Sequence, residues 1–317
     1  MKFKKILMVG ISDARLDSYY WKKIRNLGEK IVTLPKDSPD IQKELADADC
    51  LLVGFGIKVA KDHFDSAPKL TYLGTFSIAY GTVDVVYAKK KKVTVSNLDG
   101  NTTKEAVAEF VFAAILEHIR ELERGKNQAR EGNYSEAEFS VIEIKDKVFG
   151  ILGLGRIGKA VANIALAFGA DVRYWSQHRK KDAEAKGIAY QDADTLIAQS
   201  DFLSLNFAFN KDTENFLNTK RITKIKKGAV VINTSPMELV DINALNRKLL
   251  KNDFTFILDH SDEMSESDLR KLSKHKNCII YPPIAYVTKE TRIGQQESFI
   301  GNIEAFLKGK PQNVVNP

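Results

Sequence analysis

The segment Val148–Ala162 decides the fold, and it reads VFGILGLGRIGKAVA. A strand-like apolar run leads into a turn that contains Gly153, Gly155 and Gly158, and residues with helical apolar spacing follow. The first glycine permits a tight turn, the second lets the backbone approach a pyrophosphate, and the third allows the helix to pack closely on the strand. Free N–H groups at the start of such a helix favour an anion. The segment therefore predicts a dinucleotide-binding βαβ unit.

The residues after the next expected strand, Val172–Trp175, indicate the kind of dinucleotide. Sites for NAD usually carry Asp or Glu about 20 residues after the glycines, where the carboxylate accepts from the ribose hydroxyls. This chain has no carboxylate there, because Ser176 begins a polar run that ends at Lys181. Ser176 can donate to a 2′-phosphate and Arg179 can pair with it, so we expect NADP, with NAD less favoured. Besides the glycines, the expected cofactor site contains Arg156, Ile157, Ser176, Gln177, His178 and Arg179.

Length and composition are those of a globular protein with two domains. The chain has 317 residues, 44% of them hydrophobic, so each half can bury a core of its own. The formal charge is +7, but the lysines are scattered, which argues against a nucleic-acid partner. The longest apolar stretch is interrupted by Glu109 and Glu117, so neither a membrane span nor a membrane partner is expected. The N-terminus lacks a secretory-signal pattern, the two cysteines lie far apart, and the histidines lack metal-ligand spacing, so we expect a cytoplasmic protein without a metal site.

Short β-rich runs alternate with helical patterns along the chain, which is typical of parallel α/β sheets. Thr102, followed three residues later by Glu105, predicts a capping box for a long helix that continues through Leu122 and could connect two domains. A polar loop is expected over 132–143 and a last helix over 288–307. The expected fold is α/β, with two doubly wound parallel-sheet domains. The expected strands cover residues 6–9, 30–34, 51–55, 70–76, 93–97, 148–153, 172–175, 202–206, 229–233, 255–259 and 278–281.

Over nearly its whole length the chain resembles the D-isomer-specific 2-hydroxyacid dehydrogenase family. Besides the glycine turn, the similar segments are Asn97 with 107–109, 227–234, 239–241, 258–259, and 284–285 with 287–290. The segment that begins at Ser176 is most similar to the glyoxylate and hydroxypyruvate reductase branch, which favours NADPH. The resemblance also places Asn233, Thr234 and Asp259 in the cofactor site.

The resemblance implies an architecture and a reaction. The architecture is a flavodoxin-like substrate domain, residues 1–98 plus 286–317, and a Rossmann cofactor domain, residues 99–285, with the active site in the cleft between them. Members are generally homodimers that transfer a hydride between a nicotinamide cofactor and a small 2-hydroxy or 2-oxo acid. In these enzymes an Arg holds the substrate carboxylate, a His transfers the proton, and a Glu orients that His.

Two of these three catalytic residues are replaced in this chain. Pro236 stands at the Arg position and Pro283 at the His position. Neither proline can donate or accept a hydrogen bond through its side chain or nitrogen. Glu263 is the best match to the Glu position. An unmodified hydroxyacid dehydrogenase mechanism is therefore not expected.

The expected substrate loop also departs from the family pattern. Residues 75–81 read TFSIAYG where the family has a glycine-rich turn, so Phe76 and Tyr80 would add aromatic bulk around the substrate. We expect the backbone N–H groups of Ser77, Ile78 and Ala79 to bind the substrate carboxylate. Three residues could replace the missing proton donor: His260, Tyr80 and Tyr286.

Three functional hypotheses follow from this combination. The first is an NAD(P)-dependent oxidoreductase with an altered active site and a non-standard carbonyl or hydroxy substrate. The second is a catalytically silent NAD(P)-binding protein that acts as a sensor or scaffold. The third is an active hydroxyacid reductase that holds the carboxylate through the backbone of residues 77–79 and uses a relocated acid. The intact glycine turn favours the first and third, and the two prolines favour the second.

Overall fold

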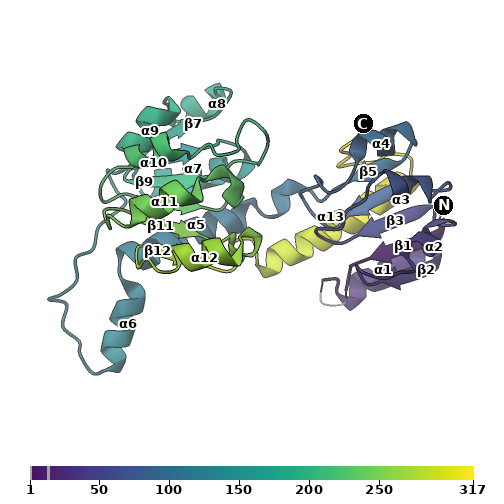
Figure 1. The fold of residues 1–317 in the computed structure, drawn as a ribbon, viewed down its shortest axis with the longest axis horizontal. Coiled ribbons are helices and arrows are strands. Elements are labelled where there is room, and N and C mark those ends of the chain that lie inside the picture. The colour runs from purple at the N-terminus through teal and green to yellow at the C-terminus, as the bar shows by residue number, and fades with distance from the viewer. Residues whose placement is uncertain (1, 13–14) are drawn as a thin grey trace. The chain divides into compact units, whose positions relative to one another are not determined.

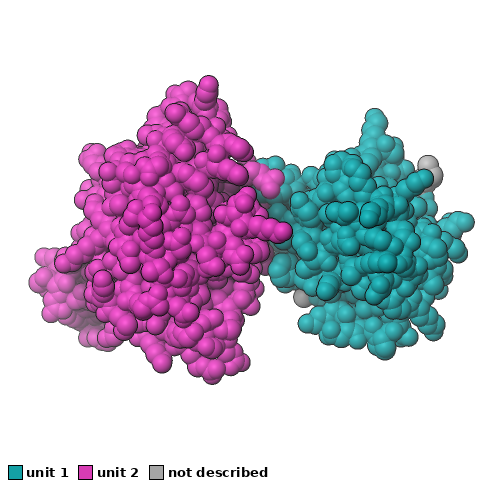
Figure 2. Space-filling model, turned by 45° about the horizontal axis from the view of Figure 1, so that its top comes forward, with its two compact units in different colours: residues 1–102, 288–317 teal, residues 103–287 magenta. Residues whose placement is uncertain are grey.

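The computed structural model describes residues 2–12 and 15–317, and the chain forms two compact units. Unit 1 comprises residues 1–102 and 288–317, and unit 2 comprises residues 103–287 (Figure 2). The chain passes from one unit to the other at 102–103 and 287–288, where the sequence predicted 98–99 and 285–286. Each unit is a parallel sheet with helices on both faces, which confirms the predicted α/β class.

Unit 1 has a five-stranded parallel sheet in the order β2-β1-β3-β4-β5, the flavodoxin-like order. Its strands are β1 (Phe3–Val9), β2 (Gly28–Leu34), β3 (Cys50–Val53), β4 (Tyr72–Thr75) and β5 (Thr94–Ser96). Its helices are α1 (Ser18–Leu27), α2 (Ile41–Leu45), α3 (Lys61–Asp65), α4 (Val85–Lys90), η1 (Gly100–Thr102) and α13 (Lys289–Leu307).

The two faces of the unit 1 sheet are covered by different parts of the chain. One face packs against α1 and α13, which contribute Ile24, Phe299 and Ile303 to a core that also contains Tyr72. The other face packs against α2, α3 and α4. The last helix is therefore part of the same core as the first strands, as Figure 1 shows for α13 and β1.

Unit 2 has a seven-stranded parallel sheet in the order β12-β11-β10-β9-β6-β7-β8. Its strands are β6 (Val148–Leu152), β7 (Asp171–Trp175), β8 (Ala189–Tyr190), β9 (Phe202–Leu205), β10 (Val230–Asn233), β11 (Thr255–Leu258) and β12 (Cys278–Ile280). Its helices are α5 (Lys104–Ile119), α6 (Leu122–Arg130), α7 (Arg156–Ala167), α8 (Lys181–Glu184), α9 (Ala193–Gln199), α10 (Thr219–Lys224), η2 (Met237–Leu239), α11 (Ile242–Leu249), η3 (Ser261–Glu263) and α12 (Glu266–Leu272).

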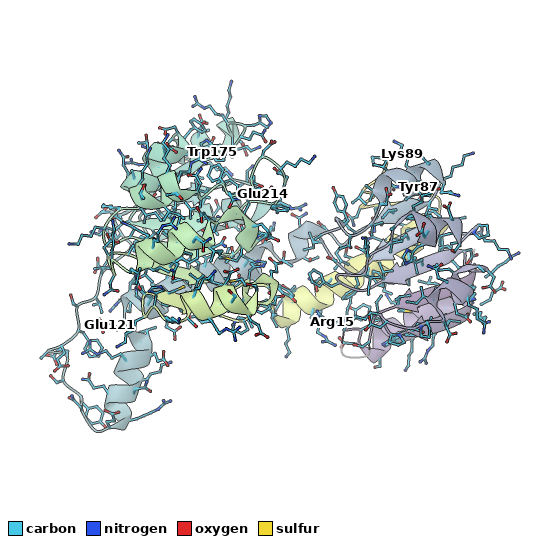
Figure 3. All side chains as sticks on the ribbon, in the orientation of Figure 1. Arg15, Tyr87, Lys89, Glu121, Trp175 and Glu214 are labelled. Carbon is cyan, nitrogen blue, oxygen red and sulfur yellow. The ribbon has the colours of Figure 1, made fainter. Side chains whose placement is uncertain are left out.

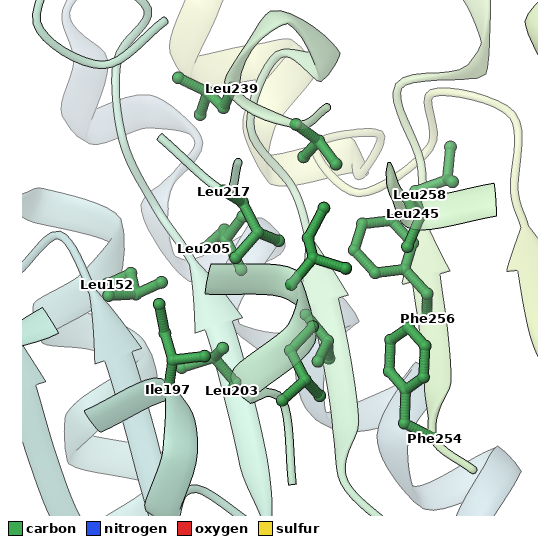
Figure 4. Packing of buried hydrophobic residues seen from close by; sticks show 14 of the residues in the cluster. Leu152, Ile197, Leu203, Leu205, Leu217, Leu239, Leu245, Phe254, Phe256 and Leu258 are labelled. Atoms are coloured by element: carbon green, nitrogen blue, oxygen red, sulfur yellow. The ribbon is translucent and has the colours of Figure 1, made fainter. Parts of the chain in front are cut away.

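Two hydrophobic cores flank this sheet. Figure 4 shows one of them, in which Leu203 and Phe256 of the strands pack with Leu245 of α11. The other lies beneath α5 and α7, where Phe112 of α5 stacks on Phe149 of β6 with ring centroids 5.4 Å apart. Because both faces are covered, the strands are buried and only their ends are open to ligands.

The long helix predicted from Thr102 to Leu122 is wrong at both ends. The Thr102 hydroxyl donates to the Asp99 carbonyl, and the helix α5 begins at Lys104, so the capping box does not form. The helix ends at Ile119 because Glu121 adopts the left-handed conformation, with φ of 49°. A separate helix, α6, follows and projects from the rest of unit 2 (Figure 1). The expected connecting helix therefore lies entirely within unit 2.

Candidate cofactor and substrate sites

The glycine turn between β6 and α7 has the geometry that the sequence predicts. Gly153 has φ of +95°, and a Cβ there would lie 2.7 Å from the Asn206 carbonyl oxygen. A Cβ at Gly158 would lie 2.1 Å from the Gly153 carbonyl oxygen, so this glycine is required for packing of the helix on the turn. By contrast, a Cβ at Gly155 would meet nothing within 4 Å. The turn is therefore tight at its first and third glycines and open to a ligand at its second.

The start of α7 offers free backbone donors beside that open glycine. Gly155 is the N-cap and brings no side chain, and the first turn of an α-helix leaves its N–H groups without intrahelical partners. Arg156 is exposed, whereas Ile157 packs against the core beneath α5. A pyrophosphate at this position would receive hydrogen bonds from the backbone and stabilisation from the helix dipole.

The segment after β7 lies at the same edge of the sheet, and its polar groups already have partners. The Ser176 hydroxyl donates to the His178 carbonyl at 2.9 Å. The Arg179 guanidinium donates to both carboxylate oxygens of Glu184, at 3.0 and 2.6 Å, and lies over the Tyr190 ring. Because Arg179 is exposed, it can turn from Glu184 toward a phosphate. Gln177 and His178 are exposed beside it.

Three polar side chains directly follow neighbouring strands of the unit 2 sheet. Asn206 follows β9, Thr234 follows β10 and Asp259 follows β11. Each has a buried oxygen without a hydrogen-bond partner in the described part of the chain: Asn206 Oδ1, Thr234 Oγ1 and Asp259 Oδ1. Buried polar atoms are normally paired. These three atoms therefore fit the polar groups of a bound dinucleotide, which is the chemistry that the glycine turn next to them predicts.

The Asn233 side chain, which sequence reasoning placed in the cofactor site, is bonded within the turn that follows β10. Its amide nitrogen donates to the Ser235 carbonyl at 2.9 Å, and its amide oxygen accepts from the Ser235 N–H at 3.1 Å. The Ser235 hydroxyl in turn donates to the Leu205 carbonyl. These bonds use the Asn233 side chain to hold the turn that carries Thr234 and Pro236.

His260 lies at this edge with carboxylates around it. Its Nε2 is 3.3 Å from the Thr234 carbonyl oxygen, and its Nδ1 is 3.2 Å from Glu263 Oε2. Burial opposes protonation of the imidazole, but Glu263, Asp259 and the Thr234 carbonyl outweigh it, so the pKa of His260 is raised. Burial also raises the pKa of Asp259, against the effects of His260 and the Ala285 N–H. The arrangement places the His260 imidazole beside the Glu263 that sequence reasoning matched to the family's Glu.

The two replacement prolines lie at the same edge. Pro236 follows β10 by three residues and precedes η2. Pro283 lies in the turn after β12, and Asp259 Oδ2 accepts from the Ala285 N–H of that turn at 3.0 Å. His260 follows β11, and β11 lies between β10 and β12, the two strands that precede Pro236 and Pro283.

The expected substrate loop follows β4 in unit 1, and hydrogen bonds from neighbouring residues hold two of its carbonyl groups. The Ser77 carbonyl accepts from the Thr75 hydroxyl and the Leu98 N–H, and the Ile78 carbonyl accepts from the Asn97 amide at 2.6 Å. Within residues 2–12 and 15–317, the N–H groups of residues 77–79 have no hydrogen-bond acceptor. A loop with three free N–H groups can bind a carboxylate.

The aromatic residues of this loop differ from each other in exposure. Tyr80 is 41% exposed, so its hydroxyl can reach solvent or a ligand. Phe76 is 8% exposed, and its ring packs edge-on against Phe299 of α13 at 5.0 Å. The Tyr80 ring is thus open to a ligand, whereas the Phe76 ring packs mainly in the core; that both rings add bulk around the substrate stays a prediction.

Sequence reasoning missed Asn206 and the aromatic residues beside it. Trp175, the last residue of β7 (labelled in Figure 3), lies 5.7 Å from the Phe207 ring, and Phe207 in turn packs against Gly153. A signal was available, because Asn206, like Thr234 and Asp259, is a polar residue directly after a buried strand.

The fold and site together define a two-unit α/β protein with a turn of the dinucleotide-binding type. Residues 112–285 match the model of the D-isomer specific 2-hydroxyacid dehydrogenase NAD-binding domain. A glyoxylate reductase of Thermococcus litoralis is 33% identical over 89% of this chain and 88% of its own length. A hydroxypyruvate reductase of Blautia hydrogenotrophica is 30% identical over 93% and 94%. The chain belongs to the D-isomer-specific 2-hydroxyacid dehydrogenase family.

Solved structures agree with this assignment. A D-lactate dehydrogenase of Aquifex aeolicus, solved with NAD and lactic acid, is 27% identical with a TM-score of 0.84 over 98% of this chain and 99% of its own. An acyclic imino acid reductase, solved with NADPH and D-Arg, is 30% identical with the same TM-score of 0.84 and the same coverage of 98% and 99%. A nicotinamide cofactor is thus common to both. Within the described residues, no helix is long and apolar enough to cross a membrane, and no cluster of three metal-ligating side chains occurs.

Proposed function

We propose that this chain is an NADP-dependent oxidoreductase that acts on a non-standard carbonyl or hydroxy substrate, with His260 as the proton donor. The observation that carries the proposal is the position of His260: its Nδ1 lies 3.2 Å from Glu263 Oε2, and it follows β11, whose neighbours β10 and β12 precede Pro236 and Pro283. The substrate class is a small molecule, as in the whole family.

In the proposed mechanism, the residues of unit 2 hold the cofactor and supply the proton. The bound nicotinamide cofactor supplies or accepts the hydride. The backbone at the start of α7 would bind the pyrophosphate, and Asn206, Thr234 and Asp259 would bind other polar groups. During reduction, His260 would donate a proton to the substrate oxygen, and Glu263 would stabilise the imidazolium. For unit 1 taken by itself, we propose that the N–H groups of residues 77–79 bind a carboxylate. Tyr80 is the second choice for the donor.

The His260 assignment predicts a specific pH profile. The imidazole must be protonated to donate, so kcat for reduction should fall as the pH rises through the raised pKa of His260. Glu263 is one of the groups that raise this pKa, so Glu263→Gln should move the fall to lower pH. His260→Asn should remove that limb of the profile and lower kcat about 10²-fold. Steady-state rates measured between pH 5 and 10 would check this.

A matched control is His63→Asn, because His63 lies in unit 1, where its Nδ1 accepts from the Ala60 N–H. This variant should leave the profile unchanged. If His260→Asn kept the full rate and the same pH dependence, the donor would be another group, with Tyr80→Phe the next variant to test.

NADPH should bind at least several-fold more tightly than NADH. The reason is the absence of a carboxylate after β7 and the presence of Ser176, Arg179 and two lysines there. Substituting Ser176 by Asp and Arg179 by Ala should reverse the preference, because Asp repels a 2′-phosphate and accepts from ribose hydroxyls. Fluorescence titration of both cofactors would measure this. Equal affinities in the starting protein would contradict it.

A second candidate function is reduction of C=N in an imino acid. The imino acid reductase that is 30% identical to this chain favours it. A protonated imine already carries the proton and the positive charge that Pro283 and Pro236 cannot provide, so the hydride can be accepted without an acid. NADPH oxidation that requires a 2-oxo acid together with ammonium or methylamine would identify this reaction.

The same assays also test the hypothesis that this chain is a catalytically silent NAD(P)-binding protein. Tight NADPH binding without turnover on any carbonyl or imine would establish a sensor or scaffold.

We further propose a homodimer, which the exposed apolar side chains of Leu122, Tyr134, Val141 and Ile142 on the projecting part of unit 2 support. Light scattering would measure the mass. Cys50 and Cys278 are buried and free, which supports the expected cytoplasmic location.

A further inference from the structure

A small cavity lies at the edge of the unit 1 sheet where β1, β3 and β4 end. Its volume is about 110 Å³, and its lining residues are Gly10, Ile11, Arg15, Gly54, Phe55 and Phe76. These residues come from three separate parts of the chain, each directly after a strand. In parallel sheets, this edge is where ligands usually bind.

The floor of the cavity is backbone that leaves no room for side chains. Gly10 has φ of +66°, and its N–H donates to the Leu34 carbonyl at 2.9 Å. Gly54 donates to the Val9 carbonyl at 2.9 Å, and a Cβ at Gly54 would lie 2.2 Å from the Gly10 carbonyl oxygen. The floor is thus held in place by the sheet and is formed before any ligand binds.

Among the described residues that line the cavity, Arg15 carries a positive charge, and the other side chains are apolar. Arg15 is exposed (labelled in Figure 3), and its guanidinium forms no ion pair within residues 2–12 and 15–317. An arginine above an apolar cavity with a fixed floor is suited to bind an anionic group at the end of a short carbon chain.

The cavity adjoins the loop that we assign to the substrate carboxylate. Phe76 lines the cavity, and Ser77, the first residue of that loop, follows it directly. The two features share one edge of unit 1, so one molecule can occupy both. Its carboxylate would contact the N–H groups of residues 77–79, and its side chain would enter the cavity.

We propose that this cavity is the side-chain pocket of the substrate and that Arg15 selects a second acidic group, so the substrate is a four-carbon 2-oxo dicarboxylate or its imine. This inference rests on the proposed function. The cavity is small, about 110 Å³, so it favours a short side chain. The group –CH2–COO⁻ is short and carries the charge that Arg15 requires.

The test measures binding separately from turnover. The full-length protein, saturated with NADP⁺ so that no reduction occurs, is titrated by calorimetry with oxaloacetate, 2-oxobutanoate, 2-oxopentanoate and 2-oxoglutarate. Oxaloacetate should bind at least about tenfold more tightly than the two monocarboxylates, because only it supplies an ion-paired side chain. 2-Oxoglutarate should bind more weakly than oxaloacetate, because its side chain is one carbon longer.

Arg15 variants separate the charge from the shape of the pocket. Arg15→Met should remove the preference by weakening oxaloacetate at least about tenfold while leaving 2-oxobutanoate unchanged. Arg15→Lys should retain part of it, because a lysine keeps the charge without the two-pronged geometry. The matched control is Lys69→Met, an exposed cation elsewhere in unit 1, which should change nothing. Circular dichroism would verify that each variant is folded.

The outcomes distinguish this inference from the proposed function. Selective binding without turnover of the NADPH-loaded protein would retain the pocket and overturn the reductase. Turnover with equal affinity for the four acids, or an unchanged preference in Arg15→Met, would overturn the pocket and leave the reductase in place. Failure of all four acids to bind the NADP⁺-loaded protein would overturn the pocket as well.

Discussion

Glyoxylate and hydroxypyruvate should be poor substrates, with kcat/KM at least about 10³-fold below the usual enzyme range of about 10⁴–10⁸ M⁻¹s⁻¹. A general acid contributes about 10²–10⁴ in rate, and a charge-assisted clamp contributes about 1.5–3 kcal/mol. Pro236 and Pro283 supply neither. These small acids also lack the side chain that would reach Arg15. NADPH oxidation followed at 340 nm with each acid would measure the rates.

The expected deficit has a matching gain-of-function test. Pro236→Arg together with Pro283→His should raise the glyoxylate rate more than either change alone, because both groups act on one carbonyl and their effects are not additive. The backbone at Pro236 has φ of −52° and ψ of 143°, a conformation that arginine also adopts. The control is Pro236→Ala with Pro283→Ala, which removes both rings without adding a donor and should give no gain.

Vigorous reduction of glyoxylate by the unmodified protein would contradict this expectation. It would mean that residues other than those of the family supply both the acid and the clamp. His260 would then be the first residue to test as the acid.

Gly155→Val should abolish dinucleotide binding and leave the protein folded. A Cβ at this position meets nothing within 4 Å, so the protein itself accommodates the side chain. The valine would fill the space where the backbone approaches the pyrophosphate. Calorimetric titration with NADPH and a thermal melt would report binding and stability separately.

The neighbouring glycine provides the control. A Cβ at Gly158 would lie 2.1 Å from the Gly153 carbonyl oxygen, so Gly158→Val should lower the melting temperature because the helix must move from the strand. If Gly155→Val still bound NADPH, the binding turn would lie elsewhere. If it unfolded the protein, the space beside Gly155 would not be free.

The sheets were predictable because their signal is local. Buried parallel strands are short apolar runs, so every expected strand overlaps an observed one, and the glycine turn lies between β6 and α7 as predicted. The strand β8 was missed because it has only two residues, Ala189 and Tyr190. The break between α5 and α6 was missed because apolar periodicity does not report the positive φ of Glu121.

Side-chain partners were less predictable, because they depend on contacts between distant segments. Arg179 was expected to be available to a phosphate, but the sequence did not indicate its two bonds to Glu184. The contact between His260 and Glu263 is local, because the two residues are three positions apart in the sequence. The cavity around Arg15 could not be predicted, because Gly10, Gly54 and Phe76 meet only after the sheet has formed.

The position of α13 sets the order in which the chain can fold as it is synthesised. Unit 2 is a continuous segment, so all of its strands are available once residue 287 has left the ribosome. Unit 1 must wait, because Phe299, Ile300 and Ile303 cover a sheet face whose strands were made some 200 residues earlier. Until then Tyr72 and its neighbours remain exposed to water and to other nascent chains. Chaperone dependence should therefore reside in the half of the protein that is translated first.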